Sequence, residues 1–316
     1  MNVIFFGSSK YSVIVEKALF EKFGLSLVVT IPDKPVGRKQ ILTPSPVKKF
    51  AESVIASAAS KKLVPLRERN DEAISSQTRL PRSLSVARND IPIITTDKLD
   101  KNIIDQIAKY NPDFLVVADY GLILPNELLD FPKYAPLNVH HSLLPKYRGP
   151  SPAPSAILNG DKVSGVTVIK MSEKMDAGDI LSQEEYTLRP EETTDSLLTK
   201  LNELGVELVL GVIENFDKIK QIPQNEQKVT YTKKITKEDG FFDIDNPPSP
   251  QTLDRMIRAY SPWPGTWTKL KMESGELKII KLLPEQMIQV EGGKPMDIKD
   301  FINGYPEAKE KIEKLF

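Results

Sequence analysis

The chain has 316 residues, enough for about two domains, and its 40% hydrophobic and 27% charged residues exclude a chain that is disordered throughout. Its 43 Lys plus Arg balance 43 Asp plus Glu, so overall charge cannot hold a nucleic acid, and a polyanion must bind at a local basic patch. With no cysteine and two histidines, the sequence excludes disulfides, thiolate metal sites, a cysteine nucleophile and a multi-histidine metal site.

Apolar strands alternate with helices in the first part of the chain. We expect a strand over 2–7, a helix over 11–23 and a strand over 25–31, followed by a helix over 98–110 and a strand over 113–117. Buried strands that alternate with amphipathic helices are typical of the α/β class. They predict a doubly wound, mostly parallel sheet.

Ligands of such sheets bind beyond the carboxyl ends of the strands. The turn after Gly7, the loop at 119–121 and the segment at Asn138 are therefore expected along one rim. The turn at Gly7 lacks the further glycines of a dinucleotide site and the Gly-Lys-Ser/Thr sequence of a P-loop, so a tight turn explains that glycine equally well. No run is long and apolar enough to cross a bilayer, and we expect a cytoplasmic protein without membrane contact.

An irregular stretch interrupts this pattern. Residues 52–91 are rich in Ser, Ala and Arg and show no clear periodicity, and structureless segments of this length are unusual inside a compact domain. We interpret residues 53–90 as an inserted element, which a surface loop tolerates because loop-closure entropy grows slowly with length. Its excess of positive charge leaves open an RNA-contacting arm.

A long helix and a second domain follow. Leucines at helical spacing predict one helix over 193–216, with Thr194 or Asp195 as its cap. The polar stretch 218–228 is interpreted as a linker between a first domain over 1–217 and a smaller one over 229–316.

The smaller domain is expected to be rich in β-structure. A helix is predicted over 250–260, and the segments 265–270 and 277–282 have the pattern of short antiparallel strands.

The segment NVHHSLLPKYRG at 138–149 carries the densest chemical signal. Alternate side chains of an extended segment share a face, so Asn138, His140 and Ser142 are expected to point the same way. An amide donor beside an imidazole suits the stabilisation of an oxyanion while a proton moves nearby. A buried histidine with its hydrogen bonds satisfied is the alternative.

A short acidic turn at 175–181 follows the strand predicted over 165–171. Asp176 and Asp179 beside one glycine fit a solvated turn, and Asp176 takes part in chemistry only if the fold returns it to His140. The segment at 32–40 is basic and is expected to be a flexible loop. A charge run of this kind is usually a solvated surface.

Four runs of the sequence carry a resemblance to a known family. NVHHSLLPKYRG, GVTVIKMSEKMDAGDIL, PDKPVGRKQILTPSPVK and RAYSPWPGTWT occur here in the order and approximate spacing of the methionyl-tRNA formyltransferase family, and they resemble its motifs over most of the chain outside the irregular stretch. The first two are shared by the wider class of enzymes that use 10-formyltetrahydrofolate.

The resemblance implies a catalytic trio of Asn138, His140 and Asp176. It implies transfer of the formyl group of 10-formyltetrahydrofolate to the α-amino group of methionyl initiator tRNA, for translation initiation, with no metal and no covalent intermediate. Asn138 and His140 are expected to stabilise the oxyanion, and Asp176 is expected to orient His140 and relay a proton.

The resemblance also assigns the binding residues. The folate is expected at main-chain groups of the loop at 120–124 and the turn at 175–178, with Ser142 in support. The residues of the loop and the turn are Tyr120, Gly121, Leu122, Ile123, Leu124, Met175, Ala177 and Gly178. For the side chains of Leu122, Ile123 and Leu124, core packing is the alternative, and the hydroxyl of Ser142 could equally cap a turn. The tRNA is expected at Lys34, Arg38, Lys39 and Arg148, and Arg148 could instead orient the site.

Two features depart from the family pattern. His141 replaces a small residue or proline and is expected to pack or lie at the surface. The C-terminal domain is expected to be a shortened, barrel-like tRNA-binding domain with fewer strands. Two other functions stay open, an amino-sugar-nucleotide N-formyltransferase and a catalytically silent RNA-binding paralogue. We expect a monomer.

Overall fold

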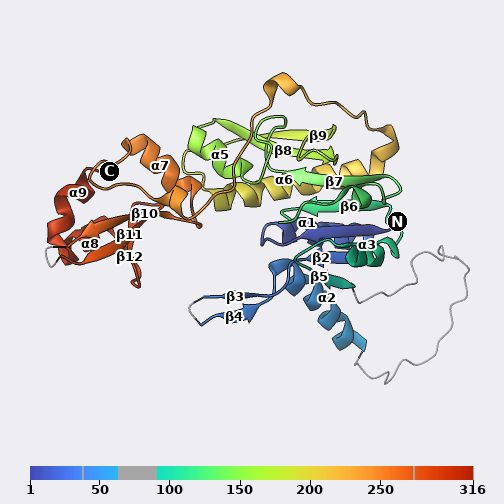
Figure 1. The fold of residues 1–316 in the computed structure, drawn as a ribbon, viewed down its shortest axis with the longest axis horizontal. Helices are drawn as coiled ribbons and strands as arrows, with labels where there is room; N and C mark the ends of the chain where they lie inside the picture. The colour runs from blue at the N-terminus through green and yellow to red at the C-terminus, as the bar shows by residue number, and fades with distance from the viewer. Residues whose placement is uncertain (38, 63–90, 273–274, 316) are drawn as a thin grey trace, which may run out of the picture. The chain divides into compact units, whose positions relative to one another are not determined.

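A computed structural model describes residues 1–37, 39–62, 91–272 and 275–315, with side chains placed except at 56–62 (Figure 1). Its largest sheet has seven strands in the order β5-β2-β1-β6-β7-β8-β9. Their bounds are β1 (Val3–Gly7), β2 (Leu27–Thr30), β5 (Ile93–Thr95), β6 (Phe114–Ala118), β7 (Ala135–His140), β8 (Val163–Lys170) and β9 (Ile180–Thr187). The described residues form two compact units, 1–137 and 138–316.

The first unit confirms the predicted parallel pattern. β1 pairs in parallel with β2 and with β6, and β2 pairs in parallel with β5. β1, β2 and β6 are buried throughout, as apolar strands inside a parallel sheet must be. The helices of this unit are α1 (Ser12–Phe23), α2 (Pro46–Lys62), α3 (Lys101–Ala108) and α4 (Asn126–Leu129).

Two expectations for the first unit were wrong. The basic segment at 32–40 is not a plain loop, because β3 (Lys34–Val36) and β4 (Ile41–Thr43) pair as an antiparallel hairpin. The stretch 52–91 is not irregular from its start, because α2 continues to Lys62 and its alanines are good helix formers. The rest of the predicted insert, 63–90, lies outside the described residues.

The second unit begins inside β7 and holds an antiparallel pair, β8 and β9. The long helix α6 (Thr194–Asn215) follows them, as predicted. Its cap is Thr193 rather than Thr194 or Asp195: the Thr193 hydroxyl accepts the N–H of Ser196, whose side chain accepts the N–H of Thr193. This reciprocal capping box fixes the start of the helix one residue earlier.

The C-terminal part of the second unit is a small antiparallel sheet with helices, as expected. Its strands have the order β10-β11-β12-β13, with β10 and β11 at the predicted positions. The bounds of these strands are β10 (Thr266–Lys271), β11 (Leu277–Leu283), β12 (Met287–Val290) and β13 (Pro295–Asp297). The other helices of the second unit are α5 (Pro152–Asn159), α7 (Pro250–Ala259), α8 (Ile298–Gly304) and α9 (Lys309–Glu313). Short 3-10 helices lie at Phe216–Lys218, Glu226–Lys228, Glu238–Gly240 and Pro306–Ala308.

The predicted linker at 218–228 is bound to the second unit. Ile222 exchanges both backbone hydrogen bonds with Ile180 at the start of β9, each at 2.9 Å. A few residues on, the N–H of Arg148 donates to the carbonyl of Thr230 at 2.8 Å, and the N–H of Thr232 donates back to Arg148 at 2.7 Å. These backbone bonds hold the segment against the residues that follow β7.

Candidate active site

The strand β7 presents the first two residues of the predicted trio. Asn138 is half-buried and His140, the last residue of the strand, is 5% exposed. Two residues apart in an extended strand, they lie on one side of it, as the sequence predicted. The loop that follows begins at the carboxyl end of β7, where an α/β sheet places its ligands.

A tight turn between β8 and β9 presents the third residue. Asp176 has φ +52°, a left-handed conformation that Asp tolerates better than most residues. Gly178 lies so close to the end of β8 that a Cβ there would be 1.7 Å from the carbonyl oxygen of Lys170. Any side chain at this position would displace the turn. The acidic turn at 175–181 is therefore closely bound to β8, not merely a solvated connection.

The trio converges at the Asp176 carboxylate. Oδ1 of Asp176 accepts a hydrogen bond from Nδ2 of Asn138 at 3.2 Å, and Oδ2 lies 3.6 Å from Nδ1 of His140. Oδ2 also accepts the backbone N–H of Gly149 at 2.8 Å. The amide and the carboxylate are in direct contact, while the imidazole is within ion-pair reach but beyond ordinary hydrogen-bond distance.

The other ring nitrogen fixes the tautomer of His140. Nε2 lies 3.0 Å from the carbonyl oxygen of Tyr147, which can only accept, so Nε2 carries a proton. In the neutral ring Nδ1 then has its lone pair toward Asp176. A proton taken up at Nδ1 converts this contact into an ion pair, so the site can hold one proton between the two side chains.

Two neighbouring residues have packing and turn roles. Ser142 donates its hydroxyl to the carbonyl of Lys146 at 2.6 Å, which is the turn-capping alternative considered from the sequence. His141 is 4% exposed, so of the two roles expected for it, the structure gives it the packing role. Among the predicted folate residues of the turn, Met175 is 52% exposed and Gly178 is buried.

Of the two roles expected for Arg148, a tRNA contact and an orienting contact in the site, its burial favours the second. Its side chain is 3% exposed, and the guanidinium donates to both carboxylate oxygens of Glu226 and, through Nε, to Oε1 of Gln224 at 3.0 Å. A buried Arg must be paired, and the contacts with Glu226 and Gln224 fix the orientation of this guanidinium. This arginine therefore holds the segment 224–226 in place.

Sequence reasoning missed two groups at the site. The N–H of Gly149 donates to Oδ2 of Asp176, whereas Asn138 donates to Oδ1, and φ +114° at Gly149 suits glycine. The side chain of Gln224 donates to the carbonyls of Asp176 and Gly178 at 2.7 and 2.8 Å. Gly149 ends the segment 138–149, so its position in that segment could have indicated a role at the site. Gln224 lies in a polar stretch 48 residues after Asp176, where no local pattern marked it.

The loop predicted to hold folate belongs to the first unit. Leu124 is buried, in line with core packing, whereas Ile123 is 75% exposed and Gly121 is exposed. The ring of Tyr120 packs edge-on against Phe6, and burial raises the pKa of its hydroxyl to about 12. That hydroxyl oxygen is buried and has no hydrogen-bond partner among the described residues.

The basic hairpin β3–β4 also belongs to the first unit. Lys34 and Lys39 are exposed, and Arg38 lies outside the described residues. Lys48 does not extend this basic surface, because its ammonium group pairs with Asp33 at 2.7 Å, and that hydrogen bond raises its pKa.

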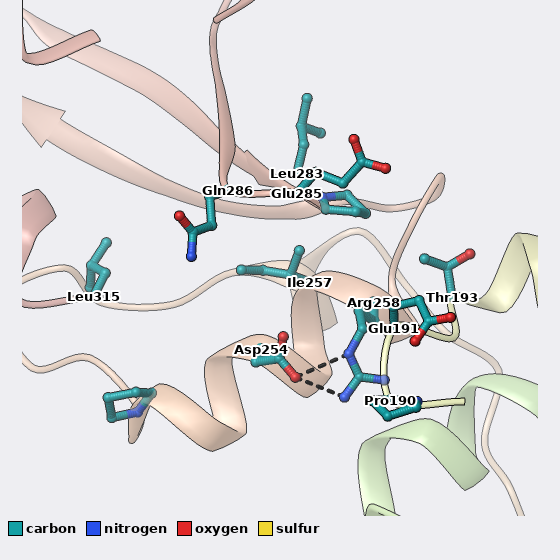
Figure 2. A pocket seen from close by; sticks show the side chains of 12 residues that line it. Pro190, Glu191, Thr193, Asp254, Ile257, Arg258, Leu283, Glu285, Gln286 and Leu315 are labelled. Atoms are coloured by element: carbon teal, nitrogen blue, oxygen red, sulfur yellow. Dashed lines mark hydrogen bonds and ion pairs between the residues drawn. The ribbon is translucent and has the colours of Figure 1, made fainter. Parts of the chain in front are cut away.

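A separate cavity lies in the second unit (Figure 2). It has a volume of about 530 Å³ and is bounded by the turn before α6, by α7 and by the turn between β11 and β12. Asp254 pairs with Arg258 at 2.7 Å within it, while Glu191 and Glu285 add negative charge. None of the trio lines this cavity, and its acidic character opposes binding of a polyanion.

Two features are absent from the described part of the chain. Within residues 1–37, 39–62, 91–272 and 275–315, no three His, Asp or Glu side chains are grouped so that they could ligate a metal ion. Over the same ranges, no helix combines the length and apolar character that crossing a bilayer requires.

Comparison with known proteins places the chain in a family. A model described as formyl transferase matches residues 1–213, and a model described as formyl transferase, C-terminal domain, matches 234–288. The chain belongs to the formyltransferase family. This formyltransferase therefore carries its Asn138, His140 and Asp176 within the N-terminal match, which ends close to the carboxyl end of α6.

Curated relatives are similar along nearly their whole length. A methionyl-tRNA formyltransferase of Caldicellulosiruptor saccharolyticus is 32% identical, over 96% of this chain and 97% of its own. One from Listeria monocytogenes is 35% identical, over 96% and 95%, and one from Campylobacter lari is 35% identical, over 96% of each.

Solved structures of formyltransferases share the fold. A 4-N formyltransferase from Francisella tularensis matches with a TM-score of 0.60 at 20% identity, covering 90% of this chain and 98% of that one. A methionyl-tRNA formyltransferase from Clostridium thermocellum matches with a TM-score of 0.56 at 14% identity, covering 94% and 96%. The mostly parallel seven-stranded sheet followed by a small antiparallel sheet is thus the formyltransferase architecture.

Proposed function

We propose that this formyltransferase transfers the formyl group of 10-formyltetrahydrofolate to the α-amino group of methionine esterified to initiator tRNA. The observation that carries the proposal is the convergence of an amide, an imidazole and a carboxylate at Asn138, His140 and Asp176. The acceptor is supported by the curated relatives, which are named methionyl-tRNA formyltransferase and match over nearly their whole length. The amino-sugar alternative rests on structures under 25% identical, which share only the fold.

The pair of His140 and Asp176 transfers the proton from the attacking amine to the leaving nitrogen. The donor supplies a formyl carbon open to attack by an amine and a nitrogen that leaves with a proton. Nδ1 of His140 faces Oδ2 of Asp176 at 3.6 Å, so the two can accept the proton that the attacking amine loses and return it to the leaving nitrogen. Because Tyr147 holds the Nε2 proton, the ring keeps Nδ1 turned toward the carboxylate throughout.

Asn138 stabilises the charge that develops on the formyl oxygen. One of its two amide hydrogens is directed to Asp176, which fixes the orientation of the amide and leaves the second hydrogen for the oxygen. A preorganised donor of this kind is worth about 3–4 kcal/mol in the transition state. Positive charge on the His140 ring acts in the same direction.

The donor is proposed to bind at the loop 120–124 and at the turn 175–178. The exposed side chain of Met175 offers apolar surface to the flat ring of the donor. The tRNA is proposed to bind at the exposed Lys34 and Lys39 and at Arg38, where a guanidinium can contact phosphate and stack on a base.

An acceptor-choice assay tests the proposal. The purified chain is given 10-formyltetrahydrofolate labelled in the formyl group, with methionyl initiator tRNA or with a 4-amino-sugar nucleotide as acceptor. We expect label in the tRNA-bound methionine and none in the sugar. Label in the sugar alone would assign the amino-sugar function, and label in neither would favour the silent RNA-binding paralogue.

A further inference from the structure

The side-chain amide of Gln224 joins two parts of the site. Its Nε2 donates to the carbonyl of Asp176 at 2.7 Å and to that of Gly178 at 2.8 Å. Its Oε1 accepts from Nε of Arg148 at 3.0 Å. Both N–H groups of Nε2 therefore donate to the backbone of one turn, and this turn carries the Asp176 carboxylate.

Together with a bond from Gly149, these hydrogen bonds hold both the backbone and the side chain of Asp176. Arg148 directly precedes Gly149, whose N–H donates to Oδ2 of Asp176 at 2.8 Å. One short segment therefore holds the Asp176 side chain through Gly149 and the Asp176 backbone through Arg148 and Gln224. The left-handed φ of +52° at Asp176 has no regular secondary structure to maintain it, and the two carbonyl contacts restrain that peptide.

The Arg148 side chain, which supports Gln224, is itself held in place. Arg148 is 3% exposed, its guanidinium pairs with Glu226 at 2.8 Å, and its backbone exchanges hydrogen bonds with Thr230 and Thr232. Gln224 is thus held between a buried cation and a tight turn. Such a bridge positions a carboxylate better than a free loop does, because the supporting groups cannot move independently.

We propose that Gln224 is a positioning residue that sets the approach of the Asp176 carboxylate to the His140 ring. The inference rests on the proposed function, in which this pair moves the proton. Gln224 does not touch the reacting atoms; it acts through Asp176. Loss of its donors lets the turn shift, and misplacement of about 1 Å costs on the order of 100-fold in rate.

Two variants and one matched control test the proposal. Gln224→Ala removes the whole bridge, whereas Gln224→Glu keeps an acceptor for Arg148 and removes both donors to the turn. The control is Gln289→Ala, which removes another glutamine amide that donates to a turn carbonyl, that of Gly293 at 3.0 Å, in the C-terminal sheet. The full-length chain is used throughout, below the melting temperature of every variant.

The first readout is kinetic. We expect both Gln224 variants to lower kcat by about 10- to 100-fold while KM for each substrate changes by less than about threefold, because binding surfaces stay in place and only the proton-moving pair is displaced. The control is expected to match the wild type. Equal kcat in wild type and both variants would overturn the proposal, as would a change confined to KM.

The second readout does not need activity. The chain has two histidines, so a long-range ¹H–¹⁵N spectrum of the imidazoles contains two rings, His140 and His141. We expect both Gln224 variants to shift the His140 signals and to leave those of His141 unchanged. An unchanged His140 ring would overturn the positioning role. If the wild type transfers no formyl group, the proposed function fails, and this spectrum still decides whether Gln224 sets the Asp176–His140 geometry.

Discussion

Oδ2 of Asp176 lies 3.6 Å from Nδ1 of His140, although the two residues are on different elements, the β8–β9 turn and the end of β7. The contact is an ion pair when the ring is protonated and a near contact when it is neutral. The side chains are 13% and 6% exposed, so water screens their interaction weakly. This geometry suits the proton transfer proposed for the pair.

Asp176→Asn tests the proton-moving role. The amide has nearly the same size and cannot take up a proton, so we expect kcat of formyl transfer to fall by about 10²- to 10⁴-fold with the fold intact. Steady-state kinetics and a thermal melt measure the two effects. Asp179→Asn, three residues along the same turn, is the control and is expected to keep wild-type kcat. Similar losses in both variants would show that charge in the turn matters and the Asp176–His140 pair does not.

Arg38→Ala tests the nucleic-acid surface. Lys34 and Lys39 beside it are exposed, and a guanidinium at this hairpin can contact both phosphate and base. We expect KM for charged tRNA to rise by at least about tenfold, KM for the formyl donor to stay unchanged, and the salt dependence of tRNA binding to weaken. Lys101→Ala, at an exposed lysine in α3, serves as the control. Equal effects on both substrates would contradict the assignment.

Arg148→Ala tests the structural role that the fold assigns to this residue. Its loss leaves Gln224 without a donor and removes the pairing with Glu226. We expect the free energy of unfolding to fall by about 2 kcal/mol, measured by urea titration, because charge-assisted hydrogen bonds of a buried group are lost. Lys39→Ala, at an exposed residue, is expected to leave stability unchanged. If the stability of Arg148→Ala matches the wild type, the buried network is unimportant.

Glu16→Gln tests a buried acid in α1. Burial raises the pKa of Glu16 from 4.5 to about 9, and both carboxylate oxygens lack a hydrogen-bond partner among the described residues. At pH values between these two pKa values, Glu16 is protonated in the folded chain and ionised in the unfolded chain. The free energy of unfolding therefore falls as pH rises from about 5 to about 9. The slope from this group is at most about 1.4 kcal/mol per pH unit.

Urea titrations across that range measure the effect. We expect Glu16→Gln to remove much of the alkaline loss of stability, because the amide stays neutral at every pH. Glu21→Gln, on the exposed side of the same helix, is the control and is expected to keep the wild-type pH dependence. A wild type whose stability is flat over this range would contradict the buried neutral acid.

Periodicity and turn chemistry predicted the regular elements well. The apolar runs at β1, β2 and β6 and the leucine spacing of α6 are local features, because burial selects residues within each element. The cap of α6 was placed one residue late, since three adjacent residues can all cap a helix and only the contact with Ser196 selects Thr193. The hairpin β3–β4 was missed because its short strands are exposed and carry no alternation.

The sequence by itself determined the α/β class, the family and the identity of the three chemical groups, because these depend on residue type and on spacing along the chain. Tertiary structure alone decided that Asp176 reaches His140, that Arg148 is buried against Gln224 and Glu226, and that a polar linker supports the turn of the site. Each of those contacts joins residues far apart in the chain. Such pairings are selected by the packing of whole elements, and no local pattern contains them.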